Sequence, residues 1–172
     1  AIGPDIAYWQ ADVTDVEALR TAIAAAETRF GPITAAFHLA LAMHDARAVT
    51  LTEAQLRAVL APKTDGTRAL MAALADRTLD AVMLFSSSNA LTTNPGQSAY
   101  AAASAAQDAI GLAPAPWPVK IVDWGFWGEV GRVASPAYHA SLARIGVYPI
   151  ATREGLSVIE RMMTAPIPRI VP

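Results

Sequence analysis

The chain contains no cysteine, which excludes disulfides and thiolate metal sites. It also lacks a large excess of charge of either sign, because 13 lysines and arginines oppose 15 aspartates and glutamates and leave a formal net charge of -2. There is thus no basic field to attract nucleic acid or anionic lipid. No apolar run reaches the roughly 20 residues of a membrane span, and the chain does not start with the order of a signal peptide. We therefore expect no nucleic-acid or membrane partner and a cytoplasmic location.

A further absence concerns glycine. None of the 10 glycines stands in a G-x-G-x-x-G sequence, the turn between strand and helix that cradles the pyrophosphate of a dinucleotide. Gly125-x-x-Gly128-x-x-Gly131 lacks the G-x-G spacing, and we interpret it as a loop. By itself, the chain is therefore expected not to bind NADPH at micromolar affinity.

What the sequence does contain is an alternation of apolar strands and amphipathic helices, with 53% hydrophobic residues overall. Strands are predicted at residues 6–9, 33–39, 81–85, 119–122 and 169–171. Helices are predicted between residues 14 and 30, from 52 toward 74, around Tyr100, and at 136–145 and 152–163. This alternation predicts an α/β fold with a Rossmann-like parallel sheet and helices on both faces.

Local signals mark several helix ends. Thr14-x-x-Glu17 and Thr52-x-x-Gln55 both have the capping-box pattern, in which the first and fourth residues bond each other's backbone N–H groups. Gly31-Pro32 is expected to end the first helix. Pro62 is expected to restart or kink the second helix, because proline lacks the backbone donor that a helix needs.

Three motifs carry a resemblance to a known family: Phe85-Ser86-Ser87-Ser88, Asn94-Pro95-Gly96-Gln97 and Tyr100-Ala101-Ala102-Ala103. They resemble ketoreductase domains of modular polyketide synthases, a branch of the short-chain dehydrogenase/reductases. The likeness extends upstream to residues 10–15, 29–33 and 60–66 and downstream to Trp124-Gly125-Phe126-Trp127. It covers essentially the whole chain, in order, as the second part of such a domain. The resemblance implies one partial domain, residues 1–172, without the family's first two strands and glycine-rich turn.

The resemblance also implies a chemistry. Ketoreductases transfer a hydride from NADPH to the β-carbon of a β-ketoacyl thioester while a proton reaches the carbonyl oxygen. By this likeness Tyr100 is the proton donor, Ser87 the second hydrogen-bond donor to that oxygen, and Lys63 the cation that lowers the tyrosine pKa. Taken without the resemblance, the same residues are a turn cap, a packing tyrosine and a solvated charge.

Departures from the family pattern concern both catalysis and the cofactor. Ser104 stands four residues after Tyr100, where the family has an asparagine, and Leu41 replaces a glycine in His38-Leu39-Ala40-Leu41. We interpret His38 as a core residue at a strand end rather than as a catalyst. The positions that the resemblance assigns to the cofactor are Asp12, Val13, Ala40, Leu41, Trp124 and Gly125.

The resemblance touches stereochemistry as well. Met43-His44-Asp45 aligns with the Leu-Asp-Asp signature of ketoreductases that make the D-configured hydroxyl, and Thr92 replaces the tryptophan of the opposite type. Asp45 and Gln97 are therefore candidate substrate residues, although Asp45 is equally interpretable as a solvated loop acid. Neither His44 nor His139 has a partner at ligand spacing, so we expect no metal site.

Three hypotheses for function follow. The first is a ketoreductase portion that acts on an acyl-carrier-protein-bound substrate when a nucleotide-binding segment complements it. The second is an inactive pseudo-ketoreductase that serves as a scaffold among neighbouring synthase domains. The third is a small-molecule binding module on a decayed Rossmann-like fold.

Overall fold

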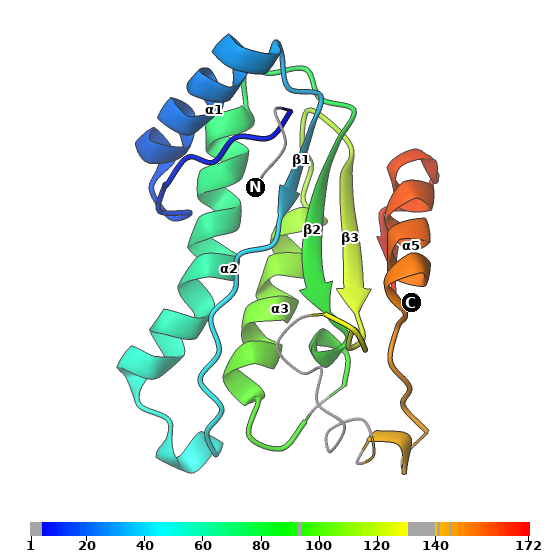
Figure 1. Ribbon diagram of the computed structural model, residues 1–172. Coiled ribbons are helices and arrows are strands. Elements are labelled where there is room, and N and C mark those ends of the chain that lie inside the picture. The colour runs from blue at the N-terminus through cyan, green and yellow to red at the C-terminus, as the bar shows by residue number, and fades with distance from the viewer. Residues whose placement is uncertain (1–4, 93, 131–139, 141, 145) are drawn as a thin grey trace.

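A parallel four-stranded sheet forms the centre of the computed structural model, which describes residues 5–92, 94–130, 140, 142–144 and 146–172 (Figure 1). The strands follow chain order across the sheet and are β1 (Ala35–His38), β2 (Ala81–Ser87), β3 (Val119–Trp124) and β4 (Arg169–Ile170). The main helices are α1 (Val16–Phe30), α2 (Glu53–Leu74), α3 (Ser98–Gly111) and α5 (Thr152–Thr164), with short 3-10 helices at Ala48–Thr50 and Ser88–Ala90. The predicted Rossmann-like α/β fold is confirmed.

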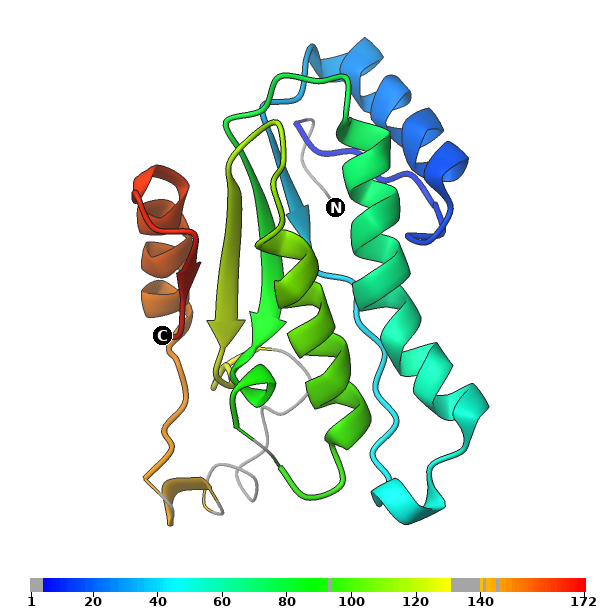
Figure 2. The same cartoon turned by 180° about the vertical axis from the view of Figure 1, so that it is seen from behind.

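The two inner strands are buried on both faces, which explains their nearly continuous apolar sequence. Val82 and Leu84 of β2 join one hydrophobic cluster with Leu74 of α2, while Met83 joins another with Met162 of α5. Successive residues of a strand point to opposite faces, so β2 supplies both clusters. As both views of the ribbon show, α2 and α3 cover one face of the sheet and α5 covers the other (Figures 1 and 2).

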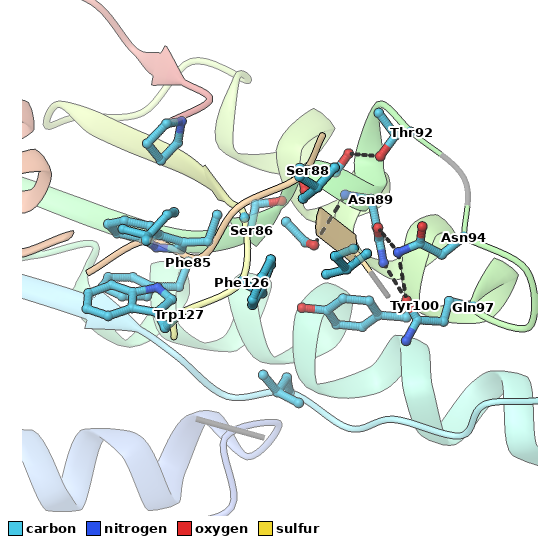
Figure 3. A pocket seen from close by; sticks show the side chains of 18 of the residues that line it. Phe85, Ser86, Ser88, Asn89, Thr92, Asn94, Gln97, Tyr100, Phe126 and Trp127 are labelled. Atoms are coloured by element: carbon cyan, nitrogen blue, oxygen red, sulfur yellow. Dashed lines mark hydrogen bonds between the residues drawn. The ribbon is translucent and has the colours of Figure 1, made fainter. Parts of the chain in front are cut away.

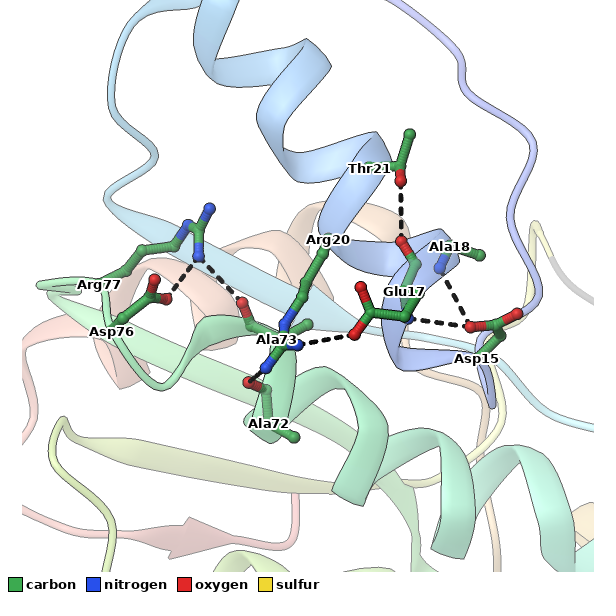
Figure 4. A network of polar contacts seen from close by, with 9 residues as sticks. All are labelled: Asp15, Glu17, Ala18, Arg20, Thr21, Ala72, Ala73, Asp76 and Arg77. Atoms are coloured by element: carbon green, nitrogen blue, oxygen red, sulfur yellow. Dashed lines mark hydrogen bonds and ion pairs between the residues drawn. The ribbon is translucent and has the colours of Figure 1, made fainter.

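Polar contacts join α1 to α2 at the periphery (Figure 4). The Arg20 guanidinium donates to Glu17 on its own helix and to the carbonyl oxygen of Ala72 at 3.4 Å. Arg77, just after α2, donates through Nε and Nη2 to the two carboxylate oxygens of Glu27, at 3.1 and 3.0 Å. This paired geometry fixes the angle between the helices better than a single contact would.

Two expectations near the start of the chain are wrong. Residues 6–9 form no strand, because β1 is an edge of the sheet and no described strand lies beyond it to supply ladder hydrogen bonds. Trp9 instead packs edge-on against Phe30, with ring centroids 6.3 Å apart. The cap of α1 is Asp15, whose carboxylate accepts from two backbone N–H groups, and the Thr14 hydroxyl is engaged with Asp12. Aspartate therefore takes the place that the capping-box pattern gave to threonine.

For α2, the predicted start is confirmed. The capping box of Thr52 and Gln55 is present, with both reciprocal hydrogen bonds. Pro62 lies inside α2 without ending it, because packing against α1 and α3 holds the helix together on both sides of the proline. The helix expected at residues 136–145 falls largely outside the described residues.

Candidate active site

A cavity of about 790 Å³ opens at the carboxyl ends of β2 and β3 (Figure 3). Its polar wall comes from the segment after β2 and from the start of α3, and its apolar wall from the segments after β1 and β3. In parallel α/β sheets, ligands bind at this edge, where the strands end and loops begin. The position of the cavity thus makes it the candidate active site.

Ser87 and Tyr100 line the cavity from two different elements. Ser87 is the last residue of β2, and its hydroxyl accepts a hydrogen bond of 3.2 Å from the backbone N–H of Asn89. Tyr100 lies in the first turn of α3, and its phenol extends into the cavity (Figure 3). The turn of Ser88–Ala90 and the loop to α3 fold the chain back, so that residues 13 positions apart share one wall.

Lys63 lies behind Tyr100 and is 1% exposed, which rules out the solvated-charge interpretation. Its Nζ donates to the carbonyl oxygen of Phe85 and to Oε1 of Gln107, each at 2.8 Å. The ammonium lies over the Tyr100 ring, 5.7 Å from its centroid. Burial lowers the pKa of Lys63 to about 8, and the nearby carboxylates of Asp108 and Asp123 oppose that shift.

The ionisation of Tyr100 is set mainly by burial. Burial raises the pKa of Tyr100, and the hydroxyls of Ser87 and Ser104 offset part of that rise. The direction is opposite to the lowering expected from Lys63, whose ammonium lies over the ring. The Ser104 hydroxyl is buried and has no hydrogen-bond partner of normal geometry in the described part of the chain, so its effect on the phenol is a weak one.

Gln107 is a site residue that the sequence reasoning missed. It is fully buried on α3, and its amide nitrogen donates to Thr67 Oγ1 at 3.1 Å. A signal was present, because Tyr100, Ser104 and Gln107 are four and three residues apart and share one helix face. A glutamine at that spacing in an alanine-rich helix indicates a buried polar contact.

At the mouth of the cavity, a cluster of amide side chains in the connection between β2 and α3 reaches the segment after β1. Gln97 Oε1 accepts from Asn89 Nδ2 at 2.8 Å, and Asn94 Nδ2 donates to Asn89 Oδ1 at 3.0 Å (Figure 3). Gln97 Nε2 in turn donates to Asp45 Oδ2 at 3.3 Å. The structure therefore brings Asp45 and Gln97 together, gives Asn94 of the same motif a contact, and adds Asn89, which lies outside the motifs.

The positions assigned to a cofactor separate into two groups. Leu41, Trp124 and Gly125 line the cavity, and the Trp124 ring also packs against Phe85 with centroids 5.4 Å apart. The others lie away from the described lining of the cavity, and they are Asp12, Val13 and Ala40. Asp12 accepts from the backbone and hydroxyl of Thr14, which lower its pKa.

His38 ends β1 in a buried position, as the sequence indicated. Burial, helped by the nearby Lys63 charge, lowers the pKa of His38 to about 4. A Cβ atom at Gly66 of α2 would lie 3.2 Å from His38 Nε2, so the glycine permits the close approach of α2 to β1. The neutral ring is a packing element between the two.

A second buried charge cluster lies behind the site. Arg169 of β4 donates through Nε to Asp123 at 2.6 Å and through Nη2 to Asp108 at 2.8 Å. Asp123 is fully buried and Asp108 is 3% exposed, and burial raises the pKa of Asp108 to about 6. One arginine thus links α3, β3 and β4.

Two classes of feature do not occur in the described part of the chain. No group of three or more histidine, aspartate or glutamate side chains is placed to hold a metal ion there. Among the described helices, none has the length and apolar character needed to cross a membrane.

The family model and the related sequences that match this chain both point to polyketide synthases. The family model described as "KR domain" matches residues 1–129. "Polyketide synthase ThaG" of Burkholderia thailandensis is 40% identical over 170 residues, which cover 97% of this chain and 3% of that protein. "Polyketide synthase PksN" of Bacillus subtilis is 30% identical over 167 residues, covering 95% of this chain and 3% of the relative. The chain spans about 3% of the length of these curated relatives.

Solved structures agree with the sequence relatives. The structure titled "Structure of A-type Ketoreductases from Modular Polyketide Synthase" superposes with a TM-score of 0.80 at 34% identity, covering 95% of this chain and 35% of that one. A ketoreductase domain from the bacillaene assembly line gives a TM-score of 0.85 at 27% identity, covering 95% of this chain and 42% of that one.

Proposed function

The chain belongs to the KR domain family of polyketide synthases, and from that premise we propose that it is the catalytic portion of a reductase. The substrate class is a carrier-bound β-ketoacyl thioester, and the product is the β-hydroxyacyl thioester. NADPH is the proposed reductant, and a nucleotide-binding segment complements these residues. The acyl carrier protein and the neighbouring synthase domains are the proposed partners.

One observation carries the proposal: Ser87 and Tyr100 present their hydroxyls to one cavity, with Lys63 buried behind the tyrosine ring. Two hydroxyl donors from different elements, aimed into one apolar cavity, suit a carbonyl oxygen that gains negative charge during reduction. A cation close to the phenol favours transfer of its proton.

The residues present fit one part of the cofactor. The cavity has room for a nicotinamide beside a short acyl group, whereas the described residues contain no glycine-rich turn for its phosphates. When bound, NADPH supplies the hydride. The task of this chain's residues is the proton, which Tyr100 donates to the carbonyl oxygen while Ser87 holds that oxygen by a hydrogen bond.

The cluster at the cavity mouth supports a role in orienting the acyl chain. Gln97 and Asp45 are linked there by a hydrogen bond, so the two residues act as one polar edge. We place the thioester against this edge, with the D-configured hydroxyl as the expected product.

A second candidate function is an inactive scaffold within a synthase. Burial raises the pKa of Tyr100, and the Ser104 hydroxyl at the family's asparagine position offsets only part of that rise. A phenol with a raised pKa is a weaker proton donor, and a scaffold would tolerate it.

The test is NADPH consumption with a short β-ketoacyl thioester, using protein in which a nucleotide-binding segment is present. Tyr100→Phe is expected to lower the rate on the order of 100-fold or more, because the proton donor is lost. Tyr8→Phe, at a 78% exposed tyrosine, is the matched control and should keep the parental rate. A parent protein that consumes no NADPH would overturn the reductase in favour of the scaffold.

A further inference from the structure

We propose that Gln107 is a positioning residue of this site, whose amide oxygen holds the Lys63 ammonium over the Tyr100 ring. The contact stands on geometry alone, whereas its role in the reaction rests on the proposed function. Lys63 Nζ lies 2.8 Å from Gln107 Oε1, both side chains are buried, and Nζ is 5.7 Å from the ring centroid. The glutamine therefore ties the lysine of α2 to the helix that carries the tyrosine.

The hydrogen-bond partners leave the amide one orientation. An ammonium group only donates, so the atom that faces Lys63 must be the amide oxygen. On the other side, the Thr67 hydroxyl gives its proton to the Lys63 carbonyl oxygen at 2.6 Å and accepts from Gln107 Nε2 at 3.1 Å. A flipped amide would set its NH₂ group against the ammonium and lose both contacts. The hydrogen bonds among Lys63, Gln107 and Thr67 thus form a closed ring in which the donor and acceptor of each bond are fixed.

The same helix face shows why position 107 carries this contact. Ser104 lies between Tyr100 and Gln107 on that face, and its buried hydroxyl has no hydrogen-bond partner of normal geometry in the described structure. The shorter side chain at 104 forms no hydrogen bond of normal geometry with the ammonium in the described structure, and the amide that does lies three residues further along α3. Without Gln107, the only described acceptor left to the ammonium would be the carbonyl oxygen of Phe85.

The charged and titratable groups around Lys63 come from three elements. His38 approaches from β1, Tyr100 and Asp108 from α3, and Asp123 from β3. The two aspartates are already paired with Arg169, and the ammonium donates instead to two neutral acceptors, the Phe85 carbonyl oxygen and Gln107 Oε1. Removing it should disfavour the protonated lysine, and replacing it by a carboxylate should favour that form.

The experiment follows the ionisation of Lys63 in the folded chain by NMR of protein labelled at the lysine ε-carbons. The sequence contains two lysines, Lys63 and Lys120, so two signals suffice, and Lys63→Arg assigns them. Gln107→Leu is expected to lower the pKa of Lys63 by about one or more, a tenfold change in proton affinity. Gln107→Glu is expected to raise it by a similar amount. Gln10→Leu, at an exposed position, should leave it unchanged.

An unchanged Lys63 pKa in folded Gln107→Leu and Gln107→Glu proteins would overturn the proposal. If Gln107→Leu does not fold, Thr67→Val removes the hydroxyl that orients the amide, and it should lower the Lys63 pKa in the same direction. In a complemented, active reductase, Gln107→Leu should shift the pH dependence of kcat and leave KM for the thioester within twofold. Shifted Lys63 pKa values in a protein without reductase activity would retain the positioning contact and overturn the proposed function alone.

Discussion

The burial of Lys63 has a direct consequence for stability. Its pKa is about 8 in the folded chain against an ordinary 10.5, so between these values the unfolded chain binds a proton that the folded chain does not. Stability must then rise with pH through this window. We expect the unfolding free energy to increase from pH 8 to pH 10, by an amount on the order of 1 kcal/mol or more.

Urea unfolding at pH 8, 9 and 10 measures this slope. Lys63→Met keeps the length of the side chain and removes the titrating group, so its slope should be smaller than that of the parent. Equal slopes in the two proteins would show that Lys63 is not the group responsible.

Single residues of the site were predictable to different degrees. Ser87 and Tyr100 lie in short, specific motifs, and the structure places both in one cavity. Gln107 stands outside those motifs, and its spacing from Tyr100 indicates only that it is buried. Its partner Lys63 is 44 positions away, so the packing of α2 against α3 is needed to identify that partner. Their catalytic roles stay predictions.

Helix α5 approaches the segment after β3 very closely at Gly155. A Cβ atom on Gly155 would lie 2.2 Å from Cη2 of Trp127, inside the aromatic cluster that Trp127 forms with Trp124. Gly155→Ala should therefore push the helix outward and lower the unfolding free energy by about 1–3 kcal/mol. The control is Arg153→Ala at an exposed position of the same helix. Thermal unfolding followed by tryptophan fluorescence measures both, and equal midpoints would refute the contact.

The short strand β4 depends on Arg169. Arg169→Met would leave Asp108 and Asp123 buried without their cation, which costs about 3 kcal/mol or more when one partner of a buried pair is removed. The loss should shrink toward pH 4, because burial already raises the pKa of Asp108 to about 6 and protonation relieves the unpaired charge.

A double-mutant cycle checks this interpretation. Adding Asp108→Asn to Arg169→Met should recover part of the stability in urea unfolding at pH 7. If the two changes are additive, the ion pair does not couple β4 to α3.

Elements were predictable where their signal was local. The apolar runs of β2 and β3 identify buried strands, and Thr52 with Gln55 identifies the start of α2. Residues 6–9 have the composition of a strand, but a strand also needs a neighbour, which local sequence does not report. Pro62 would end an isolated helix, and tertiary packing overrides that preference in α2.

At the scale of the whole molecule, the chain combines the proposed reductase cavity with a sequence that contains no glycine-rich phosphate cradle. Phosphates bind where backbone N–H groups of a glycine-rich turn meet a helix N-terminus, and the sequence contains no G-x-G-x-x-G. The isolated chain is therefore expected to show no saturable NADPH binding at about 1 μM. Titration followed by cofactor fluorescence tests this, with a complete reductase as the positive control. Saturation near that concentration would mean that other residues hold the phosphates.

The placement of both lysines gives the folded chain an unusual surface chemistry. Lys63 is 1% exposed, and Lys120, 8% exposed, donates to the carbonyl oxygens of Ala165 and Ile167. Every other side-chain cation that is permanently charged is an arginine. Amine-directed reagents therefore meet no freely accessible lysine while the fold is intact, and modification of these two residues requires the chain to open. The rate of lysine acylation thus reports the rate at which the fold opens.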